Sequence, residues 1–254
     1  MRIVTWNING LRAATKKGLA SWVTALDPDV LALQEVRATP AQLPKDWAVP
    51  AGLTAAWHPA ERLGWSGVAV WSRGPAERLG VGLDAPDPEG RVLRVRAGGV
   101  QVISTYLPSG GSGETRQAAK EAFMERFLPW SRVHATSAEP VVIVGDLNIA
   151  HGPRDVANPR TAQRMSGYLP HERLWFDELL AAGWVDVVRR HAGPVQGPYT
   201  WWSNFGKAKA EDRGWRIDHV LANAAAAARI RSARVDREAG LAVSDHAPVI
   251  VELD

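Results

Sequence analysis

The chain has 254 residues, of which 46% are hydrophobic and 22% charged, a composition typical of a globular protein. Its 30 Lys and Arg residues against 27 Asp and Glu leave a net charge of only +3, which permits a nucleic-acid partner without requiring one. The absence of cysteine excludes a disulfide framework, a thiolate metal site and a cysteine nucleophile. Any metal ion would therefore be held by Asp, Glu, Asn or His, and such an oxygen-rich site favours Mg²⁺, with Mn²⁺ as an alternative.

The first half of the chain predicts a series of strands and one helix. The helix is predicted over Gly18–Leu26. Gly98 and Gly99 separate two strand patterns and indicate a hairpin. Alternating apolar residues and short apolar runs predict strands at Arg2–Trp6, Val30–Leu33, Trp65–Trp71, Ala76–Gly82, Arg91–Arg96 and Val100–Thr105.

The second half predicts two longer helices, at Glu114–His134 and His171–Ala182. The irregular stretch from Ala150 to Pro170 is long for a compact domain, and such a loop is either functional or disordered. Because strands dominate and no linker or repeat is visible, we expect mixed sheets in a single α/β domain over residues 1–254. The further strands are predicted at Tyr199–Trp202, Trp215–Leu221, Arg229–Val235 and Pro248–Leu253.

Membrane insertion and export are not indicated by the sequence. No apolar run approaches the length of a membrane span. The N-terminal residues form a strand pattern rather than a signal peptide. We therefore expect a cytoplasmic protein that has no membrane partner.

The stretch VVIVGDLNI, residues 141–149, combines a buried strand with a polar end. Four β-branched apolar residues precede Gly145, and Asp146 and Asn148 follow two residues apart. In extended backbone that spacing sends both side chains to the same side, and Gly145 allows backbone or ligand to approach closely. Taken alone, the pattern is also typical of a strand that leaves the core through an Asp/Asn turn.

Similar polar residues follow nearly every predicted strand. Each has a structural alternative: a carboxylate can be solvated, cap a turn or pair with Arg, and a single His is more often a structural hydrogen-bonding group. Together they are the groups that metal-assisted hydrolysis of a phosphate ester requires. The set is Asn7, Asn9, Glu35, Tyr106, Asp146, Asn148, Asp218, Asp245 and His246.

Seven motifs occur in the same order as in the exonuclease III family of abasic-site endonucleases, which belongs to the endonuclease/exonuclease/phosphatase superfamily. They are WNING, LQE, TYLPSG, GDLNIAH, YTWWS, GWRIDH and SDHAPV. The resemblance covers essentially the whole chain. It implies a four-layered α/β sandwich, in which two packed mixed β-sheets are flanked by helices and the site lies at one edge between the sheets.

The resemblance also implies roles for the matching residues. Glu35 is implied as the principal Mg²⁺ ligand, with Asn9 and Asp245 as further or water-mediated ligands. Asn7 and Asn148 are implied to orient the phosphate and the attacking water.

The remaining catalytic roles are implied for Tyr106, Asp146, Asp218 and His246. Asp146 resembles the family's base for the water, and His246, paired with Asp218, resembles the group that binds and polarises the scissile phosphate. Tyr106 would contact the phosphate or the leaving oxygen. Whether Asp146 or His246 takes the proton of the water is left open. The Asp218 carboxylate would hold one tautomer of His246 and favour its charged form.

Three residues match the segments from which relatives build an apolar pocket for a flipped-out abasic sugar: Trp201, Trp215 and Ile217. The alternative is that all three are core residues, and for Trp202 we favour that alternative. Three departures from the family pattern concern activity ratios rather than reaction class. Ser109 stands where many relatives carry Asn, Asn9 is Asp in some relatives, which implies a less negative metal site here, and the Ala150–Pro170 loop varies among relatives.

The implied function is a magnesium-dependent DNA repair nuclease that cleaves the phosphodiester 5′ to abasic sites. Associated 3′-phosphodiesterase and 3′→5′ exonuclease activities on duplex DNA are also implied. The expected partner is double-stranded DNA with abasic sites or blocked 3′ ends, and a monomer is expected. Two alternatives are a phosphoesterase for a small molecule or lipid head group and a catalytically inactive DNA-binding module.

Overall fold

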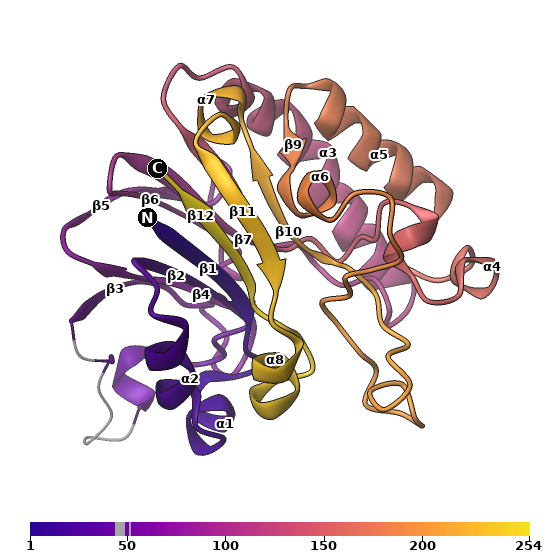
Figure 1. Ribbon diagram of the computed structural model, residues 1–254, viewed down its shortest axis with the longest axis horizontal. Coiled ribbons are helices and arrows are strands. Elements are labelled where there is room, and N and C mark those ends of the chain that lie inside the picture. The colour runs from indigo at the N-terminus through magenta and orange to yellow at the C-terminus, as the bar shows by residue number, and fades with distance from the viewer. Residues whose placement is uncertain (44–48, 51) are drawn as a thin grey trace.

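The computed structural model describes residues 1–43, 49–50 and 52–254, and places their strands in two sheets (Figure 1). Both sheets are mixed, since β1–β2 and β7–β8 are parallel pairs among antiparallel ones. Within the described ranges, the first sheet has the order β11 (Ile230–Val235), β12 (Val249–Leu253), β1 (Arg2–Asn7), β2 (Val30–Gln34), β4 (Val68–Arg73) and β3 (Leu53–His58). The second has the order β5 (Ala76–Val81), β6 (Val92–Ala97), β7 (Val100–Tyr106), β8 (Val141–Asp146), β10 (Asp218–Ala222) and β9 (Val185–Asp186).

Helices cover the outer face of each sheet. On the first sheet the cover is formed by α1 (Leu11–Lys16), α2 (Leu19–Leu26) and α8 (Arg237–Val243), and on the second by α3 (Glu114–Ala135) and α5 (Pro170–Ala181). The shorter helical elements are η1 (Pro40–Gln42), η2 (Pro153–Asp155), α4 (Pro159–Ala162), α6 (Val187–Ala192) and α7 (Ala224–Ala227). The predicted four-layered α/β sandwich is confirmed.

Alternation along the strands produces three stacked cores. In β1, Ile3 packs between the sheets, whereas Val4 and Trp6 pack beneath α1 and α2. The inner layer is rich in valine from both sheets, and the outer layer of the second sheet is closed by aromatic residues of α3 and α5 such as Phe127 and Phe176. Such two-sided burial explains why the central strands are apolar runs rather than alternating ones.

Several predicted elements agree with the structure to within one or two residues, including the long helix α3, the β6–β7 hairpin and the helix α5. The predicted strand Tyr199–Trp202 is wrong. Among the described residues this segment joins neither sheet, and Trp201 forms isolated bridges to Trp215 and His246, which also lie outside the sheets. Likewise, Trp215 precedes β10, which begins at Asp218, and Trp65 precedes β4.

The strand β3 and the helices α1, α6 and α8 were not predicted. The edge strand β3 reads LTAAWH and none of its residues is fully buried, so its apolar pattern is weak. The three helices have seven residues or fewer and their neighbours in the fold, rather than a long apolar period, hold them in place. Among the described residues, no helix is both long and apolar enough to cross a membrane.

Candidate active site

Four of the predicted site residues lie on the inner faces of the two sheets at one end. Asn7 ends β1, Tyr106 ends β7, Asp146 ends β8 and Asp218 begins β10. Each is an even number of residues from an inward-facing apolar residue of its own strand, as Asn7 is from Ile3, so the period of two carries it to the same interior. The register places Asp146 between Tyr106 and Asp218 on the neighbouring strands.

Gly145 is required by the close approach of β7. A Cβ atom at this position would lie 2.1 Å from the carbonyl oxygen of Thr105, and the backbone has φ of 133°, a region that L side chains rarely adopt. The close approach anticipated from the sequence is therefore that of a neighbouring strand. It brings β8 against β7 immediately before Asp146.

The turn after β8 is organised by the Asp146 carboxylate. Asp146 Oδ1 accepts a hydrogen bond from the Asn148 backbone N–H at 2.8 Å, and Oδ2 accepts one from the Asn148 amide at 3.2 Å. The same amide donates to Leu107 O at 2.9 Å. Asn148 adopts a left-handed conformation, with φ of 51°, which asparagine tolerates better than most residues. The Asp/Asn turn and the juxtaposition of the two side chains are thus the same feature.

Glu35 is joined to both sheets through hydrogen bonds. Its Oε1 accepts from the Asn7 amide at 3.0 Å and from the Tyr106 hydroxyl at 2.7 Å, while Oε2 pairs with Arg37. The Asn7 amide also donates to Asp146 Oδ2 at 2.9 Å, so it bridges the two carboxylates. Burial, followed by the charges of Glu35 and Asp146, raises the pKa of Tyr106, which therefore stays protonated and donates.

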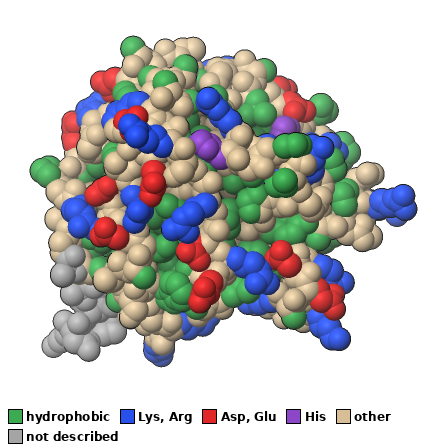
Figure 2. All heavy atoms as spheres, in the orientation of Figure 1, with side chains coloured by type: hydrophobic (Ala, Val, Ile, Leu, Met, Phe, Trp, Pro, Cys, Tyr) green, Lys and Arg blue, Asp and Glu red, His purple; other side chains and the backbone are tan. Residues whose placement is uncertain are grey.

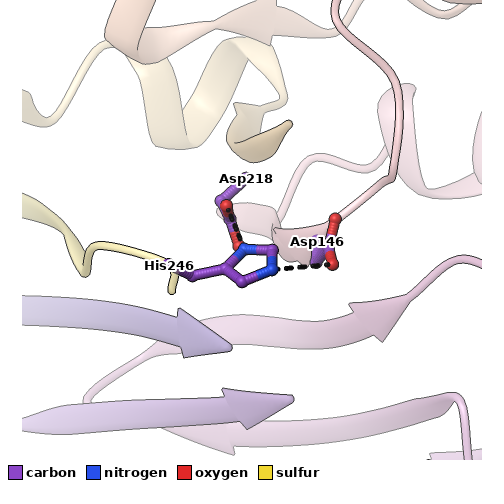
Figure 3. Close-up of side chains that lie close together, drawn as sticks. All are labelled: Asp146, Asp218 and His246. Carbon is purple, nitrogen blue, oxygen red and sulfur yellow. Dashed lines mark hydrogen bonds and ion pairs between the residues drawn. The ribbon is translucent and has the colours of Figure 1, made fainter. Parts of the chain in front are cut away.

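His246 lies between two aspartates (Figure 3). Its Nδ1 is 2.9 Å from Asp218 Oδ2, and its Nε2 is 4.0 Å from Asp146 Oδ2. Burial lowers the pKa of His246, but the charge and hydrogen bond of Asp218, together with the charge of Asp146, outweigh burial and raise it to about 10. Asp218 therefore favours the charged form of the His246 imidazole, as expected from the sequence. Burial and the Asp218 charge raise the pKa of Asp146 to about 7.

Asn9, Asp245 and the loop before β12 complete this end of the molecule. The Asn9 amide donates to Asp245 Oδ1 at 2.9 Å. The loop is held to β1 by Ser244 Oγ, which donates to Asn7 O at 2.9 Å, and by Trp6 Nε1, which donates to His246 O at 2.9 Å. These bonds fix the carboxylate of Asp245 and the imidazole of His246 relative to the strand that carries Asn7.

Two groups of side chains could be considered for a metal ion. Asp146, Asp218 and His246 offer ligand atoms within 4.8 Å of one another, but an imidazole that is protonated and bonded to Asp218 has no lone pair to give. The second group, Glu35, Asn9 and Asp245, is the one that the family resemblance implies, and it offers oxygen atoms, which hard cations prefer. In the structure Asn9 is bonded to Asp245, while Glu35 is bonded to Asn7, Tyr106 and Arg37.

The balance of charge also fits a cation near Glu35. Four carboxylates, those of Glu35, Asp146, Asp218 and Asp245, are joined by the Asn7 and Asn9 amides and by His246. Arg37 pairs with Glu35 and charged His246 pairs with Asp218, while Arg91 and Arg116 line a cavity beside Glu35. A divalent cation would reduce the repulsion that remains.

Trp201, Trp215 and Ile217 come together as predicted, in one apolar cluster. The rings of Trp201 and Trp215 meet edge to face with centroids 6.3 Å apart, and the two backbones exchange hydrogen bonds of 2.8 Å. Both tryptophans are half-buried, whereas Ile217 is buried. Trp202 is buried in a separate cluster, which agrees with its interpretation as a core residue.

A buried ion pair next to Asn148 was not predicted. Lys120 Nζ donates to Asn148 O at 2.8 Å and to Glu172 Oε1 at 2.6 Å, and both side chains are fully buried. Glu172 Oε2 accepts from the backbone N–H groups of Gly167 and Leu169 at 2.7 and 2.9 Å. The pair therefore supports the backbone of Asn148 and the turn before α5.

The sequence does contain a signal for Lys120. It lies three, four and seven residues before Phe123, Met124 and Phe127, all buried, and so falls on the apolar face of α3. A charged residue on such a face requires a partner, although the sequence does not name Glu172. Arg37 was also missed because nothing in LQEVR distinguishes it from a solvated arginine.

Comparisons with known proteins agree with this fold and this arrangement. The model of the Endonuclease/Exonuclease/phosphatase family matches residues 4–246. An exodeoxyribonuclease of Bacillus subtilis is 32% identical over 255 residues, which cover 98% of either chain. The chain belongs to the endonuclease/exonuclease/phosphatase family.

Two other members of the family are similar over the whole chain. A DNA-(apurinic or apyrimidinic site) endonuclease of Dictyostelium discoideum is 30% identical, covering 100% of this chain and 71% of that protein. The structure of a 3′ phosphatase from Neisseria, bound to a product DNA hairpin, superimposes with a TM-score of 0.88 at 30% identity and covers 100% of this chain and 99% of that one. The chain is thus an enzyme of the nuclease branch of its family by sequence and by fold.

Proposed function

We propose that this protein is a magnesium-dependent DNA repair nuclease that hydrolyses the phosphodiester 5′ to abasic sites, with 3′-phosphodiesterase and 3′→5′ exonuclease activities. The observation that carries the proposal is the convergence of Glu35, Asp146, Asn148 and the Asp218–His246 pair at one end of the two sheets. The nuclease relatives and the DNA-bound neighbour support DNA as the substrate.

The protonation states support a division of labour between Asp146 and His246. A histidine whose pKa is about 10 is charged at neutral pH, so it can bind and polarise a phosphate oxygen but cannot accept a proton. Asp146, whose pKa is about 7, can accept the proton of an attacking water. We assign Asn148 and Tyr106 to binding of the phosphate. In that role the Asn148 amide would exchange a bond to Asp146 or Leu107 for a phosphate oxygen, and the Tyr106 hydroxyl would exchange its bond to Glu35. A Mg²⁺ ion held by Glu35, Asn9 and Asp245 would supply positive charge for the oxygens on which charge grows.

Local rather than overall charge supports binding of a polyanion. Figure 2 shows Lys and Arg side chains interspersed with Asp and Glu on the face turned to the viewer, in keeping with the net charge of +3. Next to Glu35 and Tyr106, however, a cavity of about 260 Å³ is lined by Arg37, Arg91 and Arg116. The cavity also has Ser109 and Ser112 at its wall. Arg37 pairs with Glu35, and Arg91 and Arg116 pair with Glu89, so these arginines would bind a flanking phosphate by exchanging carboxylate partners for its oxygens.

One assay separates this function from its alternatives. A duplex with a single abasic site, incubated with and without Mg²⁺, should be nicked 5′ to the site only with the metal. Parallel duplexes with a 3′-phosphoglycolate or a recessed 3′ end measure the 3′-phosphodiesterase and exonuclease activities. Hydrolysis of small phosphodiesters alone would favour a small-molecule phosphoesterase, and binding without cleavage would favour an inactive module. Size-exclusion chromatography and cell fractionation test the monomeric state and cytoplasmic location that we also propose.

We expect Glu35→Gln to raise the Mg²⁺ concentration needed for half-maximal activity and to slow turnover. The substitution removes the charge of the proposed principal ligand but keeps an oxygen that can accept from Asn7 and Tyr106. Titrating Mg²⁺ and Mn²⁺ against incision measures the effect. As a control, Glu121→Gln changes a carboxylate on the surface of α3, which pairs with His171. Activity of the parent protein in excess EDTA would contradict the metal requirement.

We expect Trp215→Ala to weaken incision at an abasic site by about 1–3 kcal/mol, the scale of an aromatic contact to a nucleotide. Hydrolysis of a small activated phosphodiester should persist, because the Asp218–His246 pair is untouched. Thermal unfolding and kcat/KM on both substrates are the measurements. Trp202→Ala is the matched control: this buried tryptophan should cost about 3–5 kcal/mol of folding stability instead. The pocket is not supported if Trp215→Ala unfolds the protein or slows both substrates equally.

A further inference from the structure

A second buried charge cluster lies behind the Trp215–Ile217 wall and takes no part in the proposed chemistry. Its centre is Arg216, whose side chain is fully buried. The Arg216 guanidinium donates from Nε to Asp155 Oδ1 at 2.7 Å, and from both terminal nitrogens to Asp186, at 3.0 and 2.8 Å. Arg189 joins the cluster by pairing with Asp155. Two arginines thus face two aspartates.

His219 completes the cluster as a neutral group. Its Nδ1 lies 3.1 Å from the Arg216 guanidinium, and its Nε2 lies 2.8 Å from Ile149 O. Burial, followed by the charge of Arg216, lowers the pKa of His219 to about 4. Nδ1 therefore accepts a hydrogen bond from Arg216, and Nε2 donates one to the Ile149 carbonyl. The donor and the acceptor are thus defined for both hydrogen bonds of His219.

The backbone of residues 215–217 has no place in either sheet. It precedes β10, and it is held by Trp201 and by an isolated bridge to Val156. The Arg216 N–H donates to Asp155 O at 2.7 Å, so backbone and side chain of Arg216 both contact the same residue. Ile217 is held in addition by its N–H, which donates to Thr200 Oγ1 at 3.0 Å, and by its carbonyl, which accepts from the Leu147 N–H at 2.9 Å. The contacts of Arg216 hold the middle of this segment.

Arg216 separates the two residues of the wall. Trp215 and Ile217 belong to the apolar cluster that also contains Val156 and Tyr168, while the side chain between them enters the charged cluster. The contacts of Arg216 with Asp155 and Asp186 therefore hold two parts of that apolar cluster in place. One is the 215–217 segment, and the other is the loop that carries Val156, which is held through Asp155. Asp155 also accepts from the Gly152 N–H at 2.8 Å, which closes this loop.

We propose that Arg216, held by Asp155 and Asp186, is a positioning residue that sets the shape of the abasic-sugar pocket. The inference rests on the proposed function, because it assigns the wall to substrate selection. The guanidinium is suited to the task because its planar fork satisfies both carboxylates simultaneously. A lysine keeps the charge but has no fork, so it cannot hold both partners in the same geometry.

The test compares Arg216→Lys with the parent protein on two substrates and by ¹⁹F NMR of protein labelled with 5-fluorotryptophan. For Arg216→Lys, kcat/KM on an abasic duplex should fall about 10- to 100-fold, the scale of a misplacement of about 1 Å. Hydrolysis of bis(4-nitrophenyl) phosphate should change little. The Trp215 resonance, assigned with Trp215→Phe, should shift or broaden, while that of Trp71 in the other sheet should not.

Two further variants separate a change in pocket shape from a general loss of stability. Phe127→Leu destabilises the α3 core away from the pocket and should change neither the substrate ratio nor the Trp215 resonance. Should Arg216→Lys fail to fold, Asp186→Asn, which removes one charge of the cluster, should give the same pattern more weakly. Equal losses on both substrates with an unchanged Trp215 resonance would overturn the proposal. A parent protein that does not cleave abasic DNA would contradict the function, while the Trp215 resonance would still decide the positioning role.

Discussion

His246→Ala and Asp146→Asn should each reduce turnover on an abasic duplex by roughly 10²–10⁴-fold, the contribution of a positioned acid or base. His246→Ala removes the charged imidazole that lies 4.0 Å from Asp146 and would polarise the phosphate. Asp146→Asn removes the carboxylate that can accept the proton of the water, but it keeps a similar shape beside Asn7 and Asn148. Single-turnover kinetics at saturating enzyme measure the chemical step directly.

DNA binding should survive both substitutions, because affinity for a duplex comes mainly from phosphate contacts made elsewhere. Binding is measured with a fluorescent abasic duplex in EDTA at fixed salt. His171→Ala and Asp177→Asn are matched controls on α5, since both side chains are largely exposed and lie outside the site. If either site variant retained near-parental turnover, its assigned role would be wrong.

The positions of four proposed site residues follow from strand periodicity, whereas the segments that carry Trp201 and Trp215 were wrongly predicted as strands. Asn7, Tyr106, Asp146 and Asp218 follow the period of two along well-formed strands, so their convergence follows once the sheets pack face to face. Their chemistry is visible in the residue types. The family resemblance then supplied the roles, which neither periodicity nor spacing could have given.

The parts that could not be predicted depend on partners distant in the sequence. Trp201 and Trp215 were placed in strands because their neighbours alternate, yet their backbones bond to each other and to residues outside the sheets. Lys120 lies on the apolar face of its helix, but the sequence does not name Glu172 as its partner, and nothing local marks Arg216 as the partner of Asp155 and Asp186. A buried ion pair is defined by geometry between segments, which a linear pattern does not contain.

Asp218→Asn should move the pH optimum of incision to lower pH. In the parent protein His246 stays protonated up to about pH 10, and Asp146 is deprotonated above about pH 7, so activity should be highest between these values. Without the Asp218 charge the pKa of His246 falls, because burial, which lowers it, is then opposed mainly by the charges of Asp146 and Asp245. The pKa of Asp146 falls too, since Asp218 is one of the charges that raise it. The acidic and the alkaline limb of the pH–activity profile should therefore both shift to lower pH.

The loss should be largest in alkaline solution. Above its pKa, the protonated fraction of a histidine falls about tenfold with each pH unit, so turnover of Asp218→Asn should be reduced most at pH 9 and partly recover toward pH 6. A tetrahydrofuran analogue of the abasic site avoids alkaline strand breakage during the measurement. Asp218→Asn combined with His246→Gln should have no alkaline limb in this range, because the titrating imidazole is gone.

The pH dependence of folding stability is a second test of the Asp218–His246 pair, and it does not depend on activity. Because the pKa of His246 is raised on folding, its contribution to stability is fully present below about pH 6.5 and is lost as the pH rises through about 10. Urea unfolding of the parent protein should show this loss, and Asp218→Asn should not, since its imidazole no longer gains a proton on folding. An alkaline limb that stayed near pH 10 in Asp218→Asn would mean that another group titrates there, and the pairing of Asp218 with His246 would not be what holds the imidazole in its charged form.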